Sequence, residues 1–481
     1  EIDGYVHHLI WESARNNAED FKARLKKTTT KSWIVCGIWS TLYIAFIMWV
    51  AWGDWASLCW LLLLPIIMDM FTTQYIPWKW WKKYKPLTKE EEAKGMKNPT
   101  ANPTLYTFFS WIDAIVFALI AVYFINLYIF QNYQIPTSSL EKTMLVGDFL
   151  CVDKMSYGAR VPYTPLSMPL VQHTFPWGGK SYLNKPHWEY KRLKGWKKVE
   201  KGDIVVFNFP AGDTVVVGHE NPDYYTLRHF AQTEGYAYLQ QFYGISAHDL
   251  QNTIVRPVDR RENYVKRCVG TPGDKLQIID GVVYINGKAE PTHPNLQYNY
   301  LVKTDGQALT SNYLESLGIS KEDRVRLADG IYHFPLTKAM KAELEKNPHI
   351  ASIDIEPETL GGELYPLGHN TWTRDNYGPI YIPAKGDKIM ITQENYWLYK
   401  RIADAYEFKP IKIGETYEFD MDYYWMMGDN RHKSADSRYW GFVPEDHIVG
   451  RPMFVWLSID KDKNWGQGRI RWNRIGLSNF E

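Results

Sequence analysis

Residues 275–287 have the sequence Lys-Leu-Gln-Ile-Ile-Asp-Gly-Val-Val-Tyr-Ile-Asn-Gly, which is typical of a β-hairpin. Two runs rich in β-branched residues flank Asp280-Gly281, and both loop positions tolerate a positive φ. Three further segments have the same strand-like composition, namely 149–154, 203–209 and 264–269. Residues 131–481 are therefore predicted to form a mainly β domain.

Three longer stretches between these strands have a mixed composition with scattered Pro, Asn and Gly: 159–200, 211–262 and 290–418. Their periodicity is too weak to predict individual helices or strands. We expect a second lobe to be inserted into the β domain within about 290–418.

The first 130 residues contain three apolar runs long enough to cross a bilayer as helices. Lysine-rich segments at 22–31 and 77–97 flank these runs, and such segments stay on the cytoplasmic side of a membrane. Core helices of a soluble domain are the alternative, which the flanking Trp and Lys residues disfavour. We expect a cytosolic segment 1–32, a membrane anchor 33–130 with helices at 33–52, 56–76 and 111–130, and an extracytoplasmic domain 131–481.

Composition limits the possible functions further. The net charge of +1 offers no basic surface, so we expect no nucleic-acid partner. Aromatic residues make up 15% of the chain, with 21 Trp, which is typical of a protein at a membrane interface. The four cysteines are far apart in the sequence, which argues against a zinc site and a disulfide framework. We expect free thiols at Cys151 and Cys268, although these two residues can pair outside the cytosol.

A hydroxyl-rich segment follows the third apolar run. Residues 134–148 are Gln-Ile-Pro-Thr-Ser-Ser-Leu-Glu-Lys-Thr-Met-Leu-Val-Gly-Asp. Most segments of this composition are linkers after a helix. A nucleophilic serine is therefore a hypothesis that needs a base elsewhere in the chain.

A lysine in the strand expected at 264–269 is a candidate for that base. Strand alternation places Lys266 on the same face as Tyr264 and Cys268. Apolar surroundings disfavour the charged amine, and lowering its pKa from ~10.4 to ~8 costs about 3 kcal/mol. A neutral lysine can accept a proton from serine. The alternative is a lysine at a strand edge with its ammonium group in water.

A third segment is dense in hydrogen-bonding groups. Residues 427–441 are Met-Gly-Asp-Asn-Arg-His-Lys-Ser-Ala-Asp-Ser-Arg-Tyr-Trp-Gly. By itself this composition is also typical of a structural corner in which Asp436 and Arg438 fix a turn.

In this order, the three segments resemble bacterial signal peptidase I, and most of all its Bacteroidetes branch. Segment 134–148 is similar to the family's nucleophile box, whose register favours Ser139 over Ser138 as the nucleophile. The chain departs from the usual pattern at Ser138, often glycine, and at Lys142, where the box has a proline. Further similar motifs are Val152-Asp-Lys154, Tyr157-Gly158, Lys201–Phe207 with Pro210, Tyr264–Asp274 and Gly428–Arg438.

The resemblance implies a signal peptidase-type β core with an inserted lobe, anchored by N-terminal transmembrane helices. It implies a serine endopeptidase with a Ser–Lys dyad and without metal or cofactor. Ser139 would form an acyl-enzyme, Lys266 would be the base, and the Ser139 N–H with the Thr137 hydroxyl would stabilise the oxyanion. The other implied roles are a hydrogen bond to Lys266 from Ser434, structural support from Asp436, Arg438 and Arg267, and substrate pockets lined by Ile135, Pro136, Leu140, Met144 and Tyr264.

The resemblance also implies the biological setting. Substrates would be exported preproteins, cut after small residues at the end of the signal peptide. The enzyme would be a multi-pass protein of the bacterial inner membrane, with the catalytic domain on the periplasmic side and transient contact with the secretion translocon. Self-cleaving SOS repressors share this catalytic core but carry a DNA-binding head, which three membrane crossings exclude. An inactive binding protein on this fold is expected to lack Ser139 or Lys266.

Overall fold

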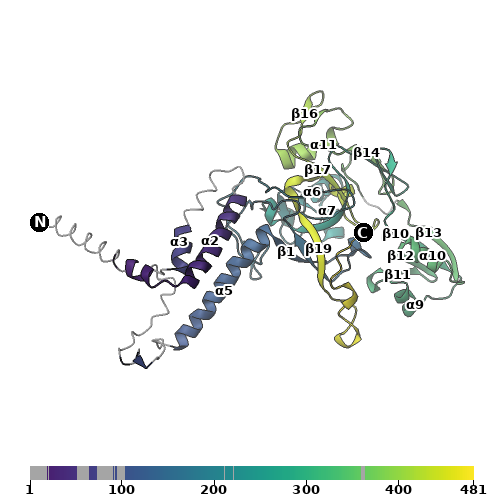
Figure 1. Cartoon of the computed structure of the whole chain (residues 1–481). Helices are drawn as coiled ribbons and strands as arrows, with labels where there is room; N and C mark the ends of the chain where they lie inside the picture. Colours follow the sequence, from purple (N-terminus) through teal and green to yellow (C-terminus); the bar gives the residue numbers. More distant parts are fainter. Residues whose placement is uncertain are drawn as a thin grey trace. The chain divides into compact units, whose positions relative to one another are not determined.

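The computed structural model describes residues 19, 21–50, 64–72, 90, 93–94, 103–210, 212–219, 222–358 and 363–480 (Figure 1). The chain divides into two compact units, Glu1–Ala121 and Val122–Glu481. Helix α5 (Pro103–Tyr128) begins in the first unit and ends in the second.

The described part of the first unit is helical. It contains α2 (Thr30–Val50), α3 (Leu64–Phe71) and the first part of α5. Two of the expected apolar runs, 33–52 and 111–130, fall largely on α2 and α5, whereas 56–76 lies partly outside the described residues. None of the helices searched within the described residues combines the length and the hydropathy of a membrane span. The membrane anchor therefore stays a prediction.

The second unit contains a seven-stranded antiparallel sheet of order β1-β2-β19-β3-β6-β17-β18. The strands predicted at 149–154, 203–209 and 264–269 are confirmed as β2, β3 and β6. This order places β6, which carries Lys266, next to β17, which leads into segment 427–441. The bounds are β1 (Phe130–Gln134), β2 (Asp148–Asp153), β3 (Ile204–Asn208), β6 (Asn263–Gly270), β17 (Tyr423–Met427), β18 (Val443–Pro444) and β19 (Ile448–Ser458).

Side chains from both faces of this sheet are buried in apolar clusters. Val205 and Phe207 of β3 pack in one cluster together with Cys268. Val206 belongs to a different cluster, which also contains Val265. The period-two alternation expected for β6, which β3 shares, thus separates two apolar layers.

The hairpin predicted from 275–287 is confirmed. Strands β7 (Lys275–Ile279) and β8 (Val282–Ile285) pair antiparallel, and both loop residues have a positive φ, 48° at Asp280 and 76° at Gly281. The hairpin belongs to a four-stranded sheet of order β14-β7-β8-β9, with β14 (Tyr377–Tyr381) and β9 (Lys288–Ala289).

A four-stranded sheet of order β11-β12-β10-β13 lies within 290–418, the range in which an inserted lobe is predicted. It has its own apolar core, which includes Val302, Tyr332 and Phe334. We call residues 297–355 the inserted lobe (Figure 1). Its elements are β10 (Gln297–Thr304), α9 (Ser311–Ser316), η4 (Lys321–Asp323), β11 (Val325–Ala328), β12 (Ile331–Thr337), α10 (Lys338–Leu344) and β13 (Ile350–Ile355).

Three short helices within 211–262 were not predicted: α6 (Tyr224–Thr233), α7 (Tyr236–Tyr243) and α8 (Ala247–Gln251). Local signals for two of them exist in the sequence, because Asp223 caps α6 and Ser246 forms a capping box with Asp249 in α8. The remaining helices and strands are β4 (Thr214–Val216), β5 (Thr253–Val255), β15 (Lys388–Met390), α11 (Tyr396–Ile402), β16 (Thr416–Glu418) and α12 (Ser437–Trp440).

Candidate active site

The candidate nucleophile lies on a short 3-10 turn, η2 (Ser138–Leu140), between β1 and β2. Ser139 is only 7% exposed. The loop is closed at its base by backbone hydrogen bonds from Ile135 N to Asp148 O and from Gly147 N to Ile135 O, each 2.9 Å. Gly147 has φ 89°, and a Cβ there would lie 2.0 Å from the carbonyl oxygen of Ile459. Glycine at this position therefore allows Ile459, directly after β19, and the end of the nucleophile loop to approach closely.

The candidate base reaches the nucleophile directly. Lys266 Nζ lies 2.6 Å from Ser139 Oγ, and the lysine is 3% exposed. Burial lowers the pKa of Lys266 to about 8, while the carboxylates of Asp436 and Asp429 act in the opposite direction. The Tyr264 ring centroid lies 5.7 Å from Nζ. The expected apolar surroundings of the lysine are confirmed, and they favour the neutral amine that a base requires.

The third predicted segment completes the site, because it contacts the backbone of the nucleophile turn. Asn430 donates from its backbone N to Ser139 O at 3.0 Å and from Nδ2 to Ser138 O at 3.2 Å. A Cβ at Gly428 would lie 2.6 Å from Ser139 O, so only glycine allows this close approach. No role was predicted for Asn430 from the sequence. The sequence did contain one indication of a role for Asn430, namely its position close to Gly428 in the third segment.

Two buried ion pairs lie beside the site. Arg267 Nε donates to Asp429 Oδ1 at 2.8 Å, and Asp429 Oδ2 also accepts from Thr143 Oγ1 at 2.6 Å. Arg438 donates to Asp436 at 2.8 Å, and Gly428 N donates to the same carboxylate at 3.2 Å. Burial acts to raise the pKa of Asp436, but Arg438 and these hydrogen bonds hold that pKa below its usual value. The pair Arg267–Asp429 joins β6 to the third segment, whereas the pair Arg438–Asp436 lies within that segment. The supporting role of Arg267, Asp436 and Arg438 stays a prediction.

The other predicted site residues are placed as follows. Thr137 is exposed, and its hydroxyl makes no capping hydrogen bond to η2. Ser434 donates to the carbonyl oxygen of Ala435 at 3.4 Å, and within the described structure it makes no hydrogen bond to Lys266. The predicted contact between Ser434 and Lys266 is therefore absent from this arrangement, and the orienting role of Ser434 stays a prediction.

The predicted substrate-lining residues differ in accessibility. Ile135, Leu140 and Met144 lie in one apolar cluster and are at most 3% exposed. Pro136 is exposed, whereas Tyr264 is half-buried and stacks on Phe209 with ring centroids 4.6 Å apart. Their role in substrate binding stays a prediction.

Two grooves lie beside the segment that carries Ser139, one lined by residues before the nucleophile turn and one lined by residues of that turn. The first, which we call the α5-side groove, has a volume of ≈ 760 Å³ and is lined by Gln134, Pro136 and Asn263. It extends to Asn126 and Leu127 at the end of α5. The second, the lobe-side groove, has a volume of ≈ 740 Å³. Its walls are Ser138, Glu141 and Lys142 of the nucleophile turn, 318–322 of the inserted lobe, and 460–463.

All cysteines that the structure describes are free thiols: Cys36, Cys151 and Cys268. This confirms the expectation for Cys151 and Cys268, whereas Cys59 lies outside the described residues. Burial raises the pKa of Cys151 and of Cys268, so neither thiol is poised as a nucleophile.

The chain was compared with known families and proteins. The model of the family described as "Signal peptidase, peptidase S26" matches residues 108–334 and 380–457. Signal peptidase I from Buchnera aphidicola subsp. Acyrthosiphon pisum is 26% identical over 363 residues, covering 74% of this chain and 77% of the relative. Signal peptidase I from Haemophilus influenzae is 25% identical over 395 residues, which cover 80% of this chain and 78% of the relative. Signal peptidase I from Helicobacter pylori is 24% identical over 351 residues, which cover 73% of this chain and 81% of the relative.

The matched ranges contain the nucleophile turn, β6 and the segment around Asn430, which are the parts that meet at the site. They also cover more than half of the chain. The chain therefore belongs to the signal peptidase family, peptidase S26.

Proposed function

We propose that this protein is a membrane-anchored signal peptidase I in which Ser139 is the nucleophile and Lys266 the general base. As a member of the signal peptidase family it is a serine peptidase, and it cleaves signal peptides from preproteins. The distance of 2.6 Å between Lys266 Nζ and Ser139 Oγ is the observation that carries the residue assignment.

The reaction follows from this pair. Neutral Lys266 takes the proton of Ser139 as Oγ attacks the carbonyl carbon of the last signal-peptide residue. When the C–N bond breaks, the lysine ammonium gives that proton to the departing amine. Lys266 then deprotonates a water molecule, which attacks the ester and releases the signal peptide from Ser139. A lysine pKa of about 8 suits both directions of proton transfer near neutral pH.

The oxyanion that forms during attack needs hydrogen-bond donors. We assign this role to the Ser139 N–H and the Thr137 hydroxyl. The exposure of Thr137 and the absence of a capping bond to η2 support the assignment, because the hydroxyl is available to a ligand. Arg267, Asp436 and Arg438 then act as structural support. Ser434 orients the lysine in our proposal, which requires its hydroxyl to turn from the Ala435 carbonyl.

The substrate segment before the cut is assigned to the α5-side groove. This groove is lined by Pro136 and by the end of α5, which carries the third predicted membrane run. A signal peptide leaving the bilayer would enter from this end. The pockets for small residues at the first and third positions before the cut are then formed around Ile135, Pro136, Leu140, Met144 and Tyr264.

We also propose the membrane arrangement predicted from the sequence: segment 1–32 in the cytosol, an anchor 33–130, and domain 131–481 in the periplasm of a bacterial cell. The charge-free run 33–52 and the lysine-rich segments around it support this arrangement. The setting brings the enzyme close to the lipid bilayer and to the secretion translocon. A periplasmic reporter fused after residue 131 should be active, and one fused within 82–98 silent. The reverse pattern would contradict the arrangement.

Cleavage of a preprotein tests the function itself. The full chain in detergent should cut a synthetic preprotein once, after a small residue at the end of its signal peptide, as read by mass spectrometry. The Ser139→Ala variant should leave the preprotein intact. Cleavage at many unrelated positions would contradict a signal peptidase.

A further inference from the structure

The nucleophile turn departs from the family pattern at Lys142, where the box has a proline. Lys142 has φ 74°, which a proline ring cannot adopt. Its Nζ donates to the carbonyl oxygen of Gly318 in the inserted lobe at 2.5 Å. The departure therefore coincides with a direct connection between the nucleophile turn and the lobe.

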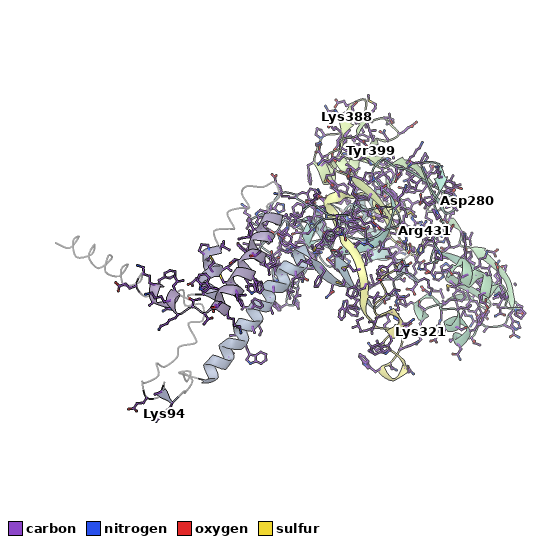
Figure 2. All side chains as sticks on the ribbon, viewed as in Figure 1. Lys94, Asp280, Lys321, Lys388, Tyr399 and Arg431 are labelled. Carbon is purple, nitrogen blue, oxygen red and sulfur yellow. The ribbon has the colours of Figure 1, made fainter. Side chains whose placement is uncertain are left out.

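The same edge of the lobe contacts other parts of the unit through charged side chains. Lys433, three residues after Asn430, pairs with Asp323, and Lys461 pairs with Glu322. Lys321 of the lobe, which is labelled in Figure 2, donates to the carbonyl oxygen of Asp462 at 3.1 Å. The lobe thus forms one wall of the lobe-side groove, opposite the nucleophile turn and segment 460–463.

Most charges in this groove are already neutralised by neighbours. Arg474 pairs with Asp148 at 2.6 Å, and Lys463 lies 3.8 Å from Glu315. Glu141 also has a cation nearby, because Lys142 Nζ lies 3.8 Å from its carboxylate, and Arg471 and Arg474 act on that carboxylate in the same direction. Glu141 differs in that its side chain is 9% exposed and accepts no hydrogen bond within the described structure, since 3.8 Å is beyond hydrogen-bond range. Burial raises the pKa of Glu141, as expected for a carboxylate that lacks donors.

The position of the groove identifies what enters it. The acyl half of the substrate is assigned to the α5-side groove, which is lined by residues before the nucleophile, such as Pro136. The part of the substrate that follows the cut must then leave the nucleophile, Ser139 Oγ, on a different side from the α5-side groove. Ser138 and Glu141, which flank Ser139 and Leu140 in the sequence, line the lobe-side groove. The groove is therefore placed to receive the chain that follows the cut.

We propose that the lobe-side groove binds the first residues of the mature protein, and that Glu141 selects a basic residue over an acidic one there. The inference rests on the proposed function. A basic side chain or a free ammonium group supplies the donors that Glu141 lacks, whereas an acidic residue places a second negative charge beside a poorly solvated carboxylate. The inserted lobe is then a substrate-binding element of this chain.

Peptide pairs test the proposal. Three substrates are identical except at the second residue after the cut, which is Lys, Gln or Glu. For the wild-type full chain, kcat/KM should fall from Lys to Gln to Glu, with about tenfold between the extremes, the scale of one charged hydrogen bond. In Glu141→Gln the Lys-to-Glu ratio should approach one, and in Glu141→Lys it should invert. Glu418→Gln is the matched control and should keep the wild-type ratio, because Glu418 pairs with Lys388 at 3.2 Å on β15–β16.

Two outcomes would overturn the inference: a wild-type preference for the acidic peptide, or a Lys-to-Glu ratio in Glu141→Gln equal to that of the wild type. A wild-type enzyme that cleaves none of the three peptides nor a full preprotein would contradict the proposed function instead. The ratio is measured within each variant, so a lower content of folded protein in one variant leaves it unchanged.

Discussion

Lys266 Nζ lies 2.6 Å from Ser139 Oγ, although the two residues are 127 positions apart in the sequence. The lysine comes from a central strand of the sheet, and the serine from a turn at its edge strands. Asn430 holds the carbonyl groups of Ser138 and Ser139 from a third segment. The distance between Lys266 Nζ and Ser139 Oγ therefore depends on three parts of the chain at once.

The pH dependence of cleavage should report the lysine. The pKa of Lys266 is lowered from 10.5 to about 8, so the amine is protonated and inactive below that pH and neutral above it. We expect kcat/KM to rise with pH through about pH 8 and then level off. Lys266→Arg should be inactive, because a guanidinium keeps its proton. The substrate should carry no group that titrates between about pH 6 and 10. A flat profile would count against a lysine base.

The same lowered pKa predicts a stability cost. In the unfolded chain Lys266 keeps its proton up to about pH 10.4, whereas in the native state it releases the proton near pH 8. The native state is therefore destabilised by the full amount below pH 8, and this destabilisation disappears as the pH rises toward ~10.4. Lys266→Met should therefore be more stable than the wild type at pH 7, by at most about 3 kcal/mol. The gain in Tm should shrink at pH 9.5. Ser139→Ala retains the lysine and serves as the control. An equal gain at both pH values would contradict the assignment.

Lys142 offers a test of the nucleophile turn. Restoring the family's proline with Lys142→Pro should destabilise the protein by more than ~1 kcal/mol and reduce kcat, because φ 74° is inaccessible to proline. Lys142→Gly accepts this φ and removes the contacts of the lysine to Gly318 and Glu141. Its Tm should stay closer to the wild-type value. Equal Tm values for the proline variant and the wild type would show that the turn does not require this conformation.

The proposed oxyanion donor can be isolated with two substitutions at one position. Thr137→Ser keeps the hydroxyl and should retain activity. Thr137→Val keeps the shape but loses the donor, and kcat should fall by roughly 10²-fold or more. KM should change less than kcat, because the donor acts on the charge that develops during attack. Normal turnover in Thr137→Val would mean that its hydroxyl does not face the oxyanion.

Local sequence patterns predicted much of the strand framework. The hairpin at Asp280-Gly281 follows from turn chemistry, and β3 and β6 follow from their strand-like composition. The pairing of Ser139 with Lys266 followed from the family resemblance, since no local rule links positions so distant in sequence. The bonds from Asn430 and the contact between Lys142 and Gly318 were not predictable for the same reason. Helix α6 was missed although its cap at Asp223 is visible, because short amphipathic segments give little periodic signal.

Cleavage of one preprotein by four variants tests the dyad most directly. Ser139→Ala and Lys266→Ala should each abolish cleavage, and the double variant should be no worse than either, because the pair acts as one unit. Ser138→Ala should retain cleavage, since Ser138 donates nothing to the Lys266 contact. Cleavage by Ser139→Ala near the wild-type rate, together with none by Ser138→Ala, would contradict the account.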